Sequence, residues 1–145
     1  MKGFVIVACS LLFAACGGTD IGAKRAEWLE RAPDRYVVGV CPTGFSGSPC
    51  RVVAVDHGVV VAAESRVSED QPWEPLVDAA EPIEALFSSA EHVGDSCDLR
   101  IEFDATYSYP TKTYFDCGEE GWGEQVMCFT ADSVDLAACR DKTVR

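Results

Sequence analysis

The sequence is short of positive charge. It contains 12 lysine and arginine residues against 24 aspartate and glutamate residues, which gives a net charge of −12 at pH 7. Nucleic-acid binding depends on cationic contacts to phosphate, and adhesion to an anionic bilayer by charge depends on clustered basic residues. The composition therefore excludes nucleic acid as a partner, and it excludes membrane binding by charge alone.

Histidine is scarce, and the motifs of common hydrolases do not occur. The two histidines are His57, in a predicted turn, and His92, at the end of a predicted helix. Neither position favours a triad, in which a histidine serves a serine or cysteine and is itself oriented by a carboxylate. The sequence also lacks G-x-S-x-G, H-E-x-x-H and any cysteine pair at the C-x-x-C spacing of zinc sites. We therefore predict no catalytic residue, no metal site and no cofactor.

No apolar run is long enough to span a bilayer, but a short one opens the chain. Lys2 is followed by an uncharged stretch over residues 4–15, which is shorter than the ~20 residues that a spanning helix needs. A positive start, an apolar middle and small residues at the end are typical of an export signal. We predict a signal peptide over residues 1–15.

The end of this run, Leu12-Phe13-Ala14-Ala15-Cys16, resembles the lipobox of bacterial lipoproteins. The resemblance implies that Cys16 becomes the lipidated first residue of the mature chain. Two or more acyl chains hold a protein firmly at a bilayer, because each buried CH₂ contributes ~0.8 kcal/mol. We predict a lipid anchor in the bacterial cell envelope and a short tether over residues 16–20, and the lack of Asp after the cysteine favours the outer membrane. The alternative is a secreted protein cut near Ala15.

Six cysteines remain once the signal and the anchor are set aside, and an even number in an exported chain indicates three disulfides. They are Cys41, Cys50, Cys97, Cys117, Cys128 and Cys139. Cys41 and Cys50 bracket one predicted hairpin loop, and Cys117 and Cys128 bracket another. We therefore expect these two pairs, which leaves Cys97 to bond Cys139. The rival arrangement has Cys97–Cys117 and Cys128–Cys139.

Periodicity predicts two helices and six strands. An apolar stripe at helical spacing covers residues 21–32, before Pro33, and a second follows Pro82 until Gly94. Strand-like stretches, rich in β-branched and aromatic residues, lie at 36–41, 51–56, 59–64, 99–104, 112–117 and 125–130.

His57-Gly58 is typical of a two-residue hairpin turn, whereas the acidic, proline-containing residues 64–82 are expected to form a loop. The order of these elements is α-βββ-α-βββ. We predict a single α+β domain over residues 21–145. Its antiparallel sheet has about five to six strands, carries both helices on one face and is stapled by disulfides.

Two clusters of side chains are candidate binding sites. Four aromatic residues fall on or beside neighbouring predicted turns and form a candidate interaction patch: Tyr107, Tyr109, Tyr114 and Trp122. The alternative is that they cover the sheet and one end of the core. Four carboxylates suit calcium by their hard oxygen atoms but match no EF-hand spacing, so we interpret them as a solvated turn: Asp116, Glu119, Glu120 and Glu124.

The order and spacing of several segments resemble a family of small exported bacterial proteins, many of them lipoproteins, known as DUF6174. The segments are Trp28, Asp34–Tyr36, Cys41, Val52–Val60, Pro82–Phe87, Ile101–Pro110 and Tyr114–Asp116. The resemblance implies no known activity, catalytic residue or ligand. The acidic stretch near Trp73 and the cysteine-rich end, residues 117–139, depart from the family pattern.

These observations predict a lipid-anchored envelope protein that binds or supports another envelope component without catalysis. An envelope protein is the expected partner, and a basic one would suit the charge of this chain. The alternative is an acidic inhibitor of a cationic cell-wall hydrolase, toward which charge would steer it. A small hydrolase that uses His57 or His92 is the third hypothesis.

Overall fold

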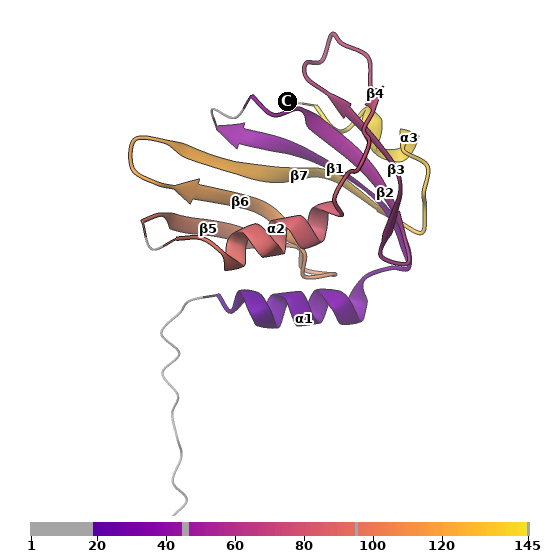
Figure 1. The fold of residues 1–145 in the computed structure, drawn as a ribbon. Coiled ribbons are helices and arrows are strands. Elements are labelled where there is room, and N and C mark those ends of the chain that lie inside the picture. Colours follow the sequence, from indigo (N-terminus) through magenta and orange to yellow (C-terminus); the bar gives the residue numbers. More distant parts are fainter. Residues whose placement is uncertain (1–18, 45–46, 95, 145) are drawn as a thin grey trace, which may run out of the picture.

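The computed structural model describes residues 19–44, 47–94 and 96–144. The predicted signal peptide and Cys16 lie outside these residues. The described chain forms a mixed α+β fold with a seven-stranded antiparallel sheet (Figure 1). Its elements are α1 (Ile21–Arg31), β1 (Arg35–Gly44), β2 (Cys50–Asp56), β3 (Val59–Arg66), β4 (Glu74–Pro75), α2 (Pro82–Glu91), β5 (Asp98–Phe103), β6 (Pro110–Asp116), β7 (Gly121–Ala131) and α3 (Ala137–Arg140).

The sheet consists of two meanders that meet at its centre. Its strand order is β4-β3-β2-β1-β7-β6-β5, so β1 to β4 form one half and β5 to β7 form the other. The halves join where β1 pairs antiparallel with β7. Because β4 and β5 lie at opposite edges, α2 carries the chain from one edge of the sheet to the other, as Figure 1 shows.

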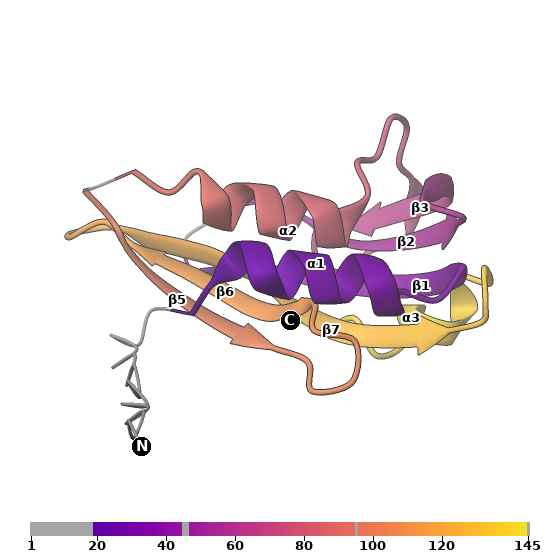
Figure 2. The same ribbon diagram turned by 90° about the horizontal axis from the view of Figure 1, so that it is seen from below.

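Both long helices pack on one face of the sheet, which we call the helix face (Figure 2). Asp20 caps α1, since its side chain accepts a hydrogen bond from the Ala23 amide at 3.0 Å, and Pro33 prevents the helix from continuing. Pro82 occupies the first turn of α2, where a missing N–H has no cost. The sequence therefore predicted both helices and their starts correctly, although α2 ends at Glu91, before Gly94.

An aromatic cluster lies under α1 on the helix face. The indole of Trp28 is 2% exposed, and its ring meets those of Tyr36, Tyr109 and Phe129 edge-on, with centroids 5.5, 5.8 and 6.1 Å away. The ring of Phe129 stacks on Tyr36 and on Tyr109. Such pairs contribute ~0.5–1.5 kcal/mol each beyond the area that they bury, so this cluster holds α1 on the sheet.

The opposite face carries the C-terminal segment over one half. Helix α3 packs there in a second cluster of buried residues that includes Val37, Val52 and Cys139. A salt bridge from Arg140 to Glu64 of β3, with nitrogen–oxygen distances of 2.5 and 2.6 Å, ties α3 down. The other half of this face, over β5, β6 and the start of β7, holds no helix in the described chain (Figure 2). We call that half the open face.

Gly39 allows the C-terminal segment to lie this close to the sheet. A Cβ atom at this position would overlap the side chain of Thr143. Thr143 is itself fully buried, and its hydroxyl donates a hydrogen bond to the Cys139 carbonyl at 2.7 Å. The missing side chain at Gly39 therefore makes room for the last turn of the fold.

The predicted number of strands was too low. The described chain has seven strands rather than five to six, because residues 64–82 are not only a loop: Glu74–Pro75 pairs with β3 as β4. Trp73 also packs into the cluster beneath α3, with the Arg66 guanidinium 4.7 Å above its ring. Helix α3 was not predicted, because four residues are too few to show a helical period.

Two of the three predicted disulfides were wrong. Cys41 bonds Cys50 as expected, but the other bridges are the rival pairs, Cys97–Cys117 and Cys128–Cys139. Three features of the fold explain this outcome.

The register of β5 with β6 places Asp98 opposite Asp116. Cys97 and Cys117, the neighbours of these two aspartates, therefore meet at the end of that hairpin. Pairing of β6 with β7 begins at Asp116 and Gly121, so Cys128 lies further along β7, beyond the partner strand. There it faces α3, whose Cys139 becomes its partner.

The hairpin between β2 and β3 was predicted correctly. His57 and Gly58 both have positive φ, 48° and 77°, as a two-residue turn of the primed type requires. Among the described residues, the helices are too short or too polar to cross a membrane.

Candidate functional site

The four residues of the predicted aromatic patch do not share one surface. Tyr107 and Tyr109 lie on the helix face and pack into the aromatic cluster around Trp28 and Phe129. Tyr109 is 6% exposed, and burial raises the pKa of its hydroxyl well above the usual range. These two tyrosines are therefore core residues, which was the alternative interpretation of the sequence.

The other two aromatic residues lie on opposite sides of the sheet. Trp122 stacks on the buried Phe115, with ring centroids 4.2 Å apart, and is 47% exposed. Since side chains alternate along a strand, Tyr114 of β6 faces away from Phe115, and its ring lies on the open face. Of the four predicted residues, Tyr114 is the one that borders a groove.

A groove of about 420 Å³ crosses the open face. Its lining residues come from β1, β5 and β6: Thr43, Arg100, Glu102, Lys112 and Tyr114. This volume lies within the range of small-molecule sites. The groove is therefore the strongest candidate for a binding site on this face.

Strand register explains why these residues come together. Thr43 lies opposite Gly123 of β7, Gly123 lies opposite Tyr114, and Tyr114 lies opposite Arg100. The four residues thus form one row across four strands. Gly123, between Thr43 and Tyr114, has no side chain and is buried, and the other three residues of the row line the groove.

Two glycines of β7 are needed for this arrangement. A Cβ atom on Gly123 would overlap the carbonyl oxygen of Thr113, and a Cβ atom on Gly121 would overlap the ring and hydroxyl of Tyr114. The Tyr114 ring therefore extends over Gly121. Gly121 and Gly123 can be seen in the sequence, on either side of Trp122. Only the strand register shows which side chains border the groove.

Charges of both signs border the groove. Arg100 is 75% exposed at its side chain and lies 3.5 Å from the Asp116 carboxylate. Lys112 lies directly opposite Glu102 on the neighbouring strand. Across the groove, the Thr43 hydroxyl oxygen is buried and has no hydrogen-bond partner among the described residues. An unpaired buried hydroxyl costs free energy.

The predicted acidic cluster is divided as well. Glu124 lies on the helix face, where its carboxylate accepts a hydrogen bond from Arg51 at 2.5 Å, whereas Glu119 and Glu120 lie in the exposed turn between β6 and β7. In residues 19–44, 47–94 and 96–144, no group of three or more histidine, cysteine or acidic side chains is arranged to hold a metal ion.

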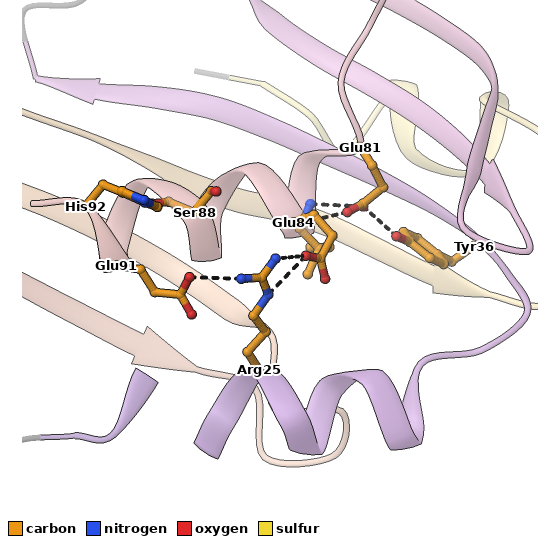
Figure 3. A network of polar contacts seen from close by, with 8 residues as sticks. Arg25, Tyr36, Glu81, Glu84, Ser88, Glu91 and His92 are labelled. Atoms are coloured by element: carbon orange, nitrogen blue, oxygen red, sulfur yellow. Dashed lines mark hydrogen bonds and ion pairs between the residues drawn. The ribbon is translucent and has the colours of Figure 1, made fainter. Parts of the chain in front are cut away.

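The histidines lie at the surface, away from the groove. His57 is 72% exposed at its side chain, and its Nδ1 atom lies 2.5 Å from the Asp56 carboxylate. His92 follows α2, where its ring contacts the carbonyl of Ser88 at 2.7 Å (Figure 3). These contacts are local to a turn and to a helix end.

A polar network joins the two long helices to each other and to the sheet (Figure 3). Arg25 of α1 donates hydrogen bonds to Glu84 at 2.6 Å and to Glu91 at 2.9 Å, both on α2. The Tyr36 hydroxyl donates to Glu81 at 2.5 Å, and Glu81 in turn caps α2.

Glu81 is the most buried carboxyl of this network. Burial raises its pKa above the usual range, although hydrogen bonds from Tyr36 and from two backbone amides act in the opposite direction. Burial and the nearby Glu81 carboxylate also raise the pKa of the Tyr36 hydroxyl. Because these contacts fix α1, α2 and β1 relative to one another, we interpret this network as structural, although the second carboxylate oxygen of Glu84 is buried without a hydrogen-bond partner in the described chain.

Comparison with known proteins identifies a family for this fold. The family of unknown function DUF6174 matches residues 20–134. The chain belongs to this family. The matched residues run from the cap of α1 to beyond the end of β7, so the DUF6174 region contains both long helices and the whole sheet. No curated protein and no solved structure matches the chain.

The match confirms the resemblance seen in the sequence and extends it. It covers Trp73 and Cys128 and stops before Cys139. Helix α3 and its cysteine therefore lie outside the matched region. The groove residues Thr43, Arg100, Glu102 and Lys112 all lie inside it, although none of them was predicted as a binding residue.

Proposed function

We propose that this DUF6174 protein is a lipid-anchored binding module of the bacterial cell envelope, without catalytic activity. The observation that carries the proposal is the pairing of six cysteines in three disulfides. They belong to a chain that opens with the features of an export signal. Structural disulfides persist in oxidising compartments and are rare in the cytosol. Their presence supports export of the chain.

The position of α1 supports a short tether. Residues 17–20 separate Cys16 from Ile21, where α1 begins, and the five residue steps between them reach roughly 18 Å at most. A lipid on Cys16 would therefore hold the domain close to the bilayer by the start of α1. Arg25, in the first half of this helix, lies beside Glu91 at the end of α2, so that end of the helix layer would lie nearest the membrane.

The open-face groove supports a binding role. It combines an aromatic ring, two cationic side chains and a carboxylate, all on strands of the sheet. Arg100 and Lys112 suit a negatively charged group, and the Tyr114 ring offers a flat apolar surface. We propose that the groove holds a polar, negatively charged component of the envelope.

The anchor is tested by the Cys16→Ser variant. Without the acyl chains, the protein is expected to leave the membrane fraction, and mass spectrometry of its N-terminal peptide should show no lipid. Cys9→Ser is the matched control, because it removes a cysteine from the predicted signal and should leave both measurements unchanged. Retention of Cys16→Ser in the membrane would contradict the anchor.

The groove is tested by photo-crosslinking in cells. A benzoylphenylalanine at position 114 should form an adduct with the envelope component, whereas the same residue at position 29 should not, since Leu29 is 66% exposed on α1, on the helix side of the sheet. The adduct should weaken when Arg100→Ala and Lys112→Ala are combined. Equal adducts at both positions would show that the groove has no special role.

A further inference from the structure

The outer edge of β3 is only half covered. Strand β4 pairs with Glu64 and Ser65, and the Leu76 amide donates a hydrogen bond to the Ala63 carbonyl at 2.9 Å. In the described chain, no strand pairs with Val59–Ala62 on this side. An edge of this kind presents backbone N–H and C=O groups on which another strand can form.

A groove of about 570 Å³ runs along this uncovered part of the edge. One wall is the β3 backbone from Val59 to Ala63, and the other is the segment Leu76 to Glu81, which leads from β4 to α2. The groove is thus bounded by a strand edge on one side and by a connecting segment on the other. This shape suits an extended polypeptide.

Two exposed valines, Val59 and Val61, line the groove, and Val77 lies in sequence between its lining residues Leu76 and Asp78. Val59, Val61 and Val77 are 63%, 54% and 80% exposed. Natural proteins normally protect an edge strand with charged residues, proline, a β-bulge or a covering segment. The register of β3 with β2 shifts at Val61, between Val60 and Ala62, but the first half of β3 still presents apolar side chains to solvent, and exposed apolar surfaces of this kind mark interaction sites.

The fold keeps this part of the edge open. After Leu76 the chain turns away from β3 at Asp78, which has a positive φ of 56°. It must turn there because Glu81 is fixed at the start of α2 by its hydrogen bonds to Tyr36 and to the helix amides. The segment after β4 therefore cannot extend along Val59–Ala62.

We propose that an extended, basic segment of a partner polypeptide adds to the sheet beside Val59–Ala62. Backbone hydrogen bonds to β3 would supply affinity, as in other cases of strand addition, and apolar side chains would contact the valines. Asp78 and Glu81 line this groove, Glu74 pairs with Ser65 at the same edge of β3, and the whole chain has a net charge of −12. These charges favour a basic segment and disfavour a second copy of this acidic chain.

The proposal is tested with the purified protein and a synthetic peptide of alternating lysine and valine. Binding should slow amide hydrogen exchange at Val59–Ala63 and leave the Tyr114 amide unchanged. The same peptide with methylated backbone nitrogens at alternate residues should not bind, because it cannot donate the ladder hydrogen bonds. A peptide of alternating glutamate and valine should bind at least about tenfold more weakly.

The Val61→Lys variant should raise the Kd for the lysine–valine peptide by about tenfold or more. Leu29→Lys is the matched control, since it adds the same charge at an exposed apolar position on α1 and should change the Kd much less. Val61→Thr, which keeps a β-branched side chain without charge, should retain most of the binding.

Three results would overturn the proposal: an equal loss of affinity in Leu29→Lys, exchange protection away from β3, or protection of Val59–Ala63 that appears with protein concentration and without peptide. The last result would identify a second copy as the occupant. The β3 edge is separate from the open-face groove and from the lipid anchor, so failure here would leave the proposed function unaffected.

Discussion

The two faces of the sheet differ in how they are covered. The helix face is closed by α1 and α2 over an aromatic cluster, and the network of Arg25, Tyr36 and Glu81 joins both helices to the sheet. The opposite face is covered by α3 over one half and is open over the other, where the unpaired Thr43 hydroxyl borders a groove. The comparison shows that one face is a packed core and that half of the other carries a groove, so substitutions on the two faces should have different effects on stability.

The largest effect is expected on the helix face. Trp28→Ala should lower the free energy of unfolding by about 3–5 kcal/mol, because the indole is almost fully buried among three other aromatic rings. Tyr114→Ala on the open face should change it by less than about 1 kcal/mol. Urea unfolding of both variants measures the difference. Similar losses in the two would contradict the division between the faces.

Removing the disulfide that holds α3 should lower the free energy of unfolding by about 3 kcal/mol. The bridge Cys128–Cys139 closes a loop with a sequence separation of 11, and chain entropy gives a value of this size. The double substitution Cys128→Ser with Cys139→Ser should lower the midpoint of urea unfolding and speed amide exchange at Val37. Amide hydrogen exchange under native conditions should speed up less on the helix face. An equal increase in exchange rate on both faces would show that α3 and the two long helices do not cover the sheet independently.

Gly39→Ala should lower the free energy of unfolding by about 1–3 kcal/mol. The new Cβ atom overlaps the Thr143 side chain, and overpacking of a tight site destabilises a protein by this amount. Thr143→Ala should recover part of that loss in the double variant, since it removes the atoms that clash. A double-mutant cycle measures this coupling. Additive effects of the two substitutions would contradict the contact.

The smallest effect is a pH dependence on the helix face. The pKa of Glu81 is raised in the folded protein, so its contribution to stability is present below the ordinary glutamate pKa and is lost as the pH rises through the folded pKa. Unfolding free energies measured from about pH 4 to pH 7 should therefore fall more steeply in the native protein than in Glu81→Gln. Identical slopes in the two proteins would contradict this role for Glu81.

Local signals in the sequence were reliable predictors of the elements. Pro33 marks the end of α1, Pro82 marks the start of α2, and His57-Gly58 marks a tight turn. Each signal acts through a hydrogen bond or a dihedral angle within a few residues. The two long helices, six of the strands and the DUF6174 membership could therefore be predicted from the sequence.

The errors concern pairs that are distant along the chain. Cys117 and Cys128 bracket a loop in sequence, but the register of β6 with β7 separates them, and β5 brings Cys97 to Cys117 instead. Strand β4 was missed because its two residues carry no periodicity and form a strand only by pairing with β3. The predicted aromatic patch failed for a similar reason, since Tyr114 and Phe115 are neighbours in sequence and face opposite sides of the sheet.

The sequence by itself determined the two long helices, most strands, the even set of bridging cysteines and the acidic surface. These features follow from propensity, turn geometry and charge, which are properties of single residues and their near neighbours. Only the tertiary structure decided which cysteines pair, that Thr43, Tyr114 and Arg100 share one row, and that the edge at Val59–Ala62 stays open. These features depend on strand register and on the order of strands in the sheet. Both follow from the packing of the whole chain rather than from any local stretch of it.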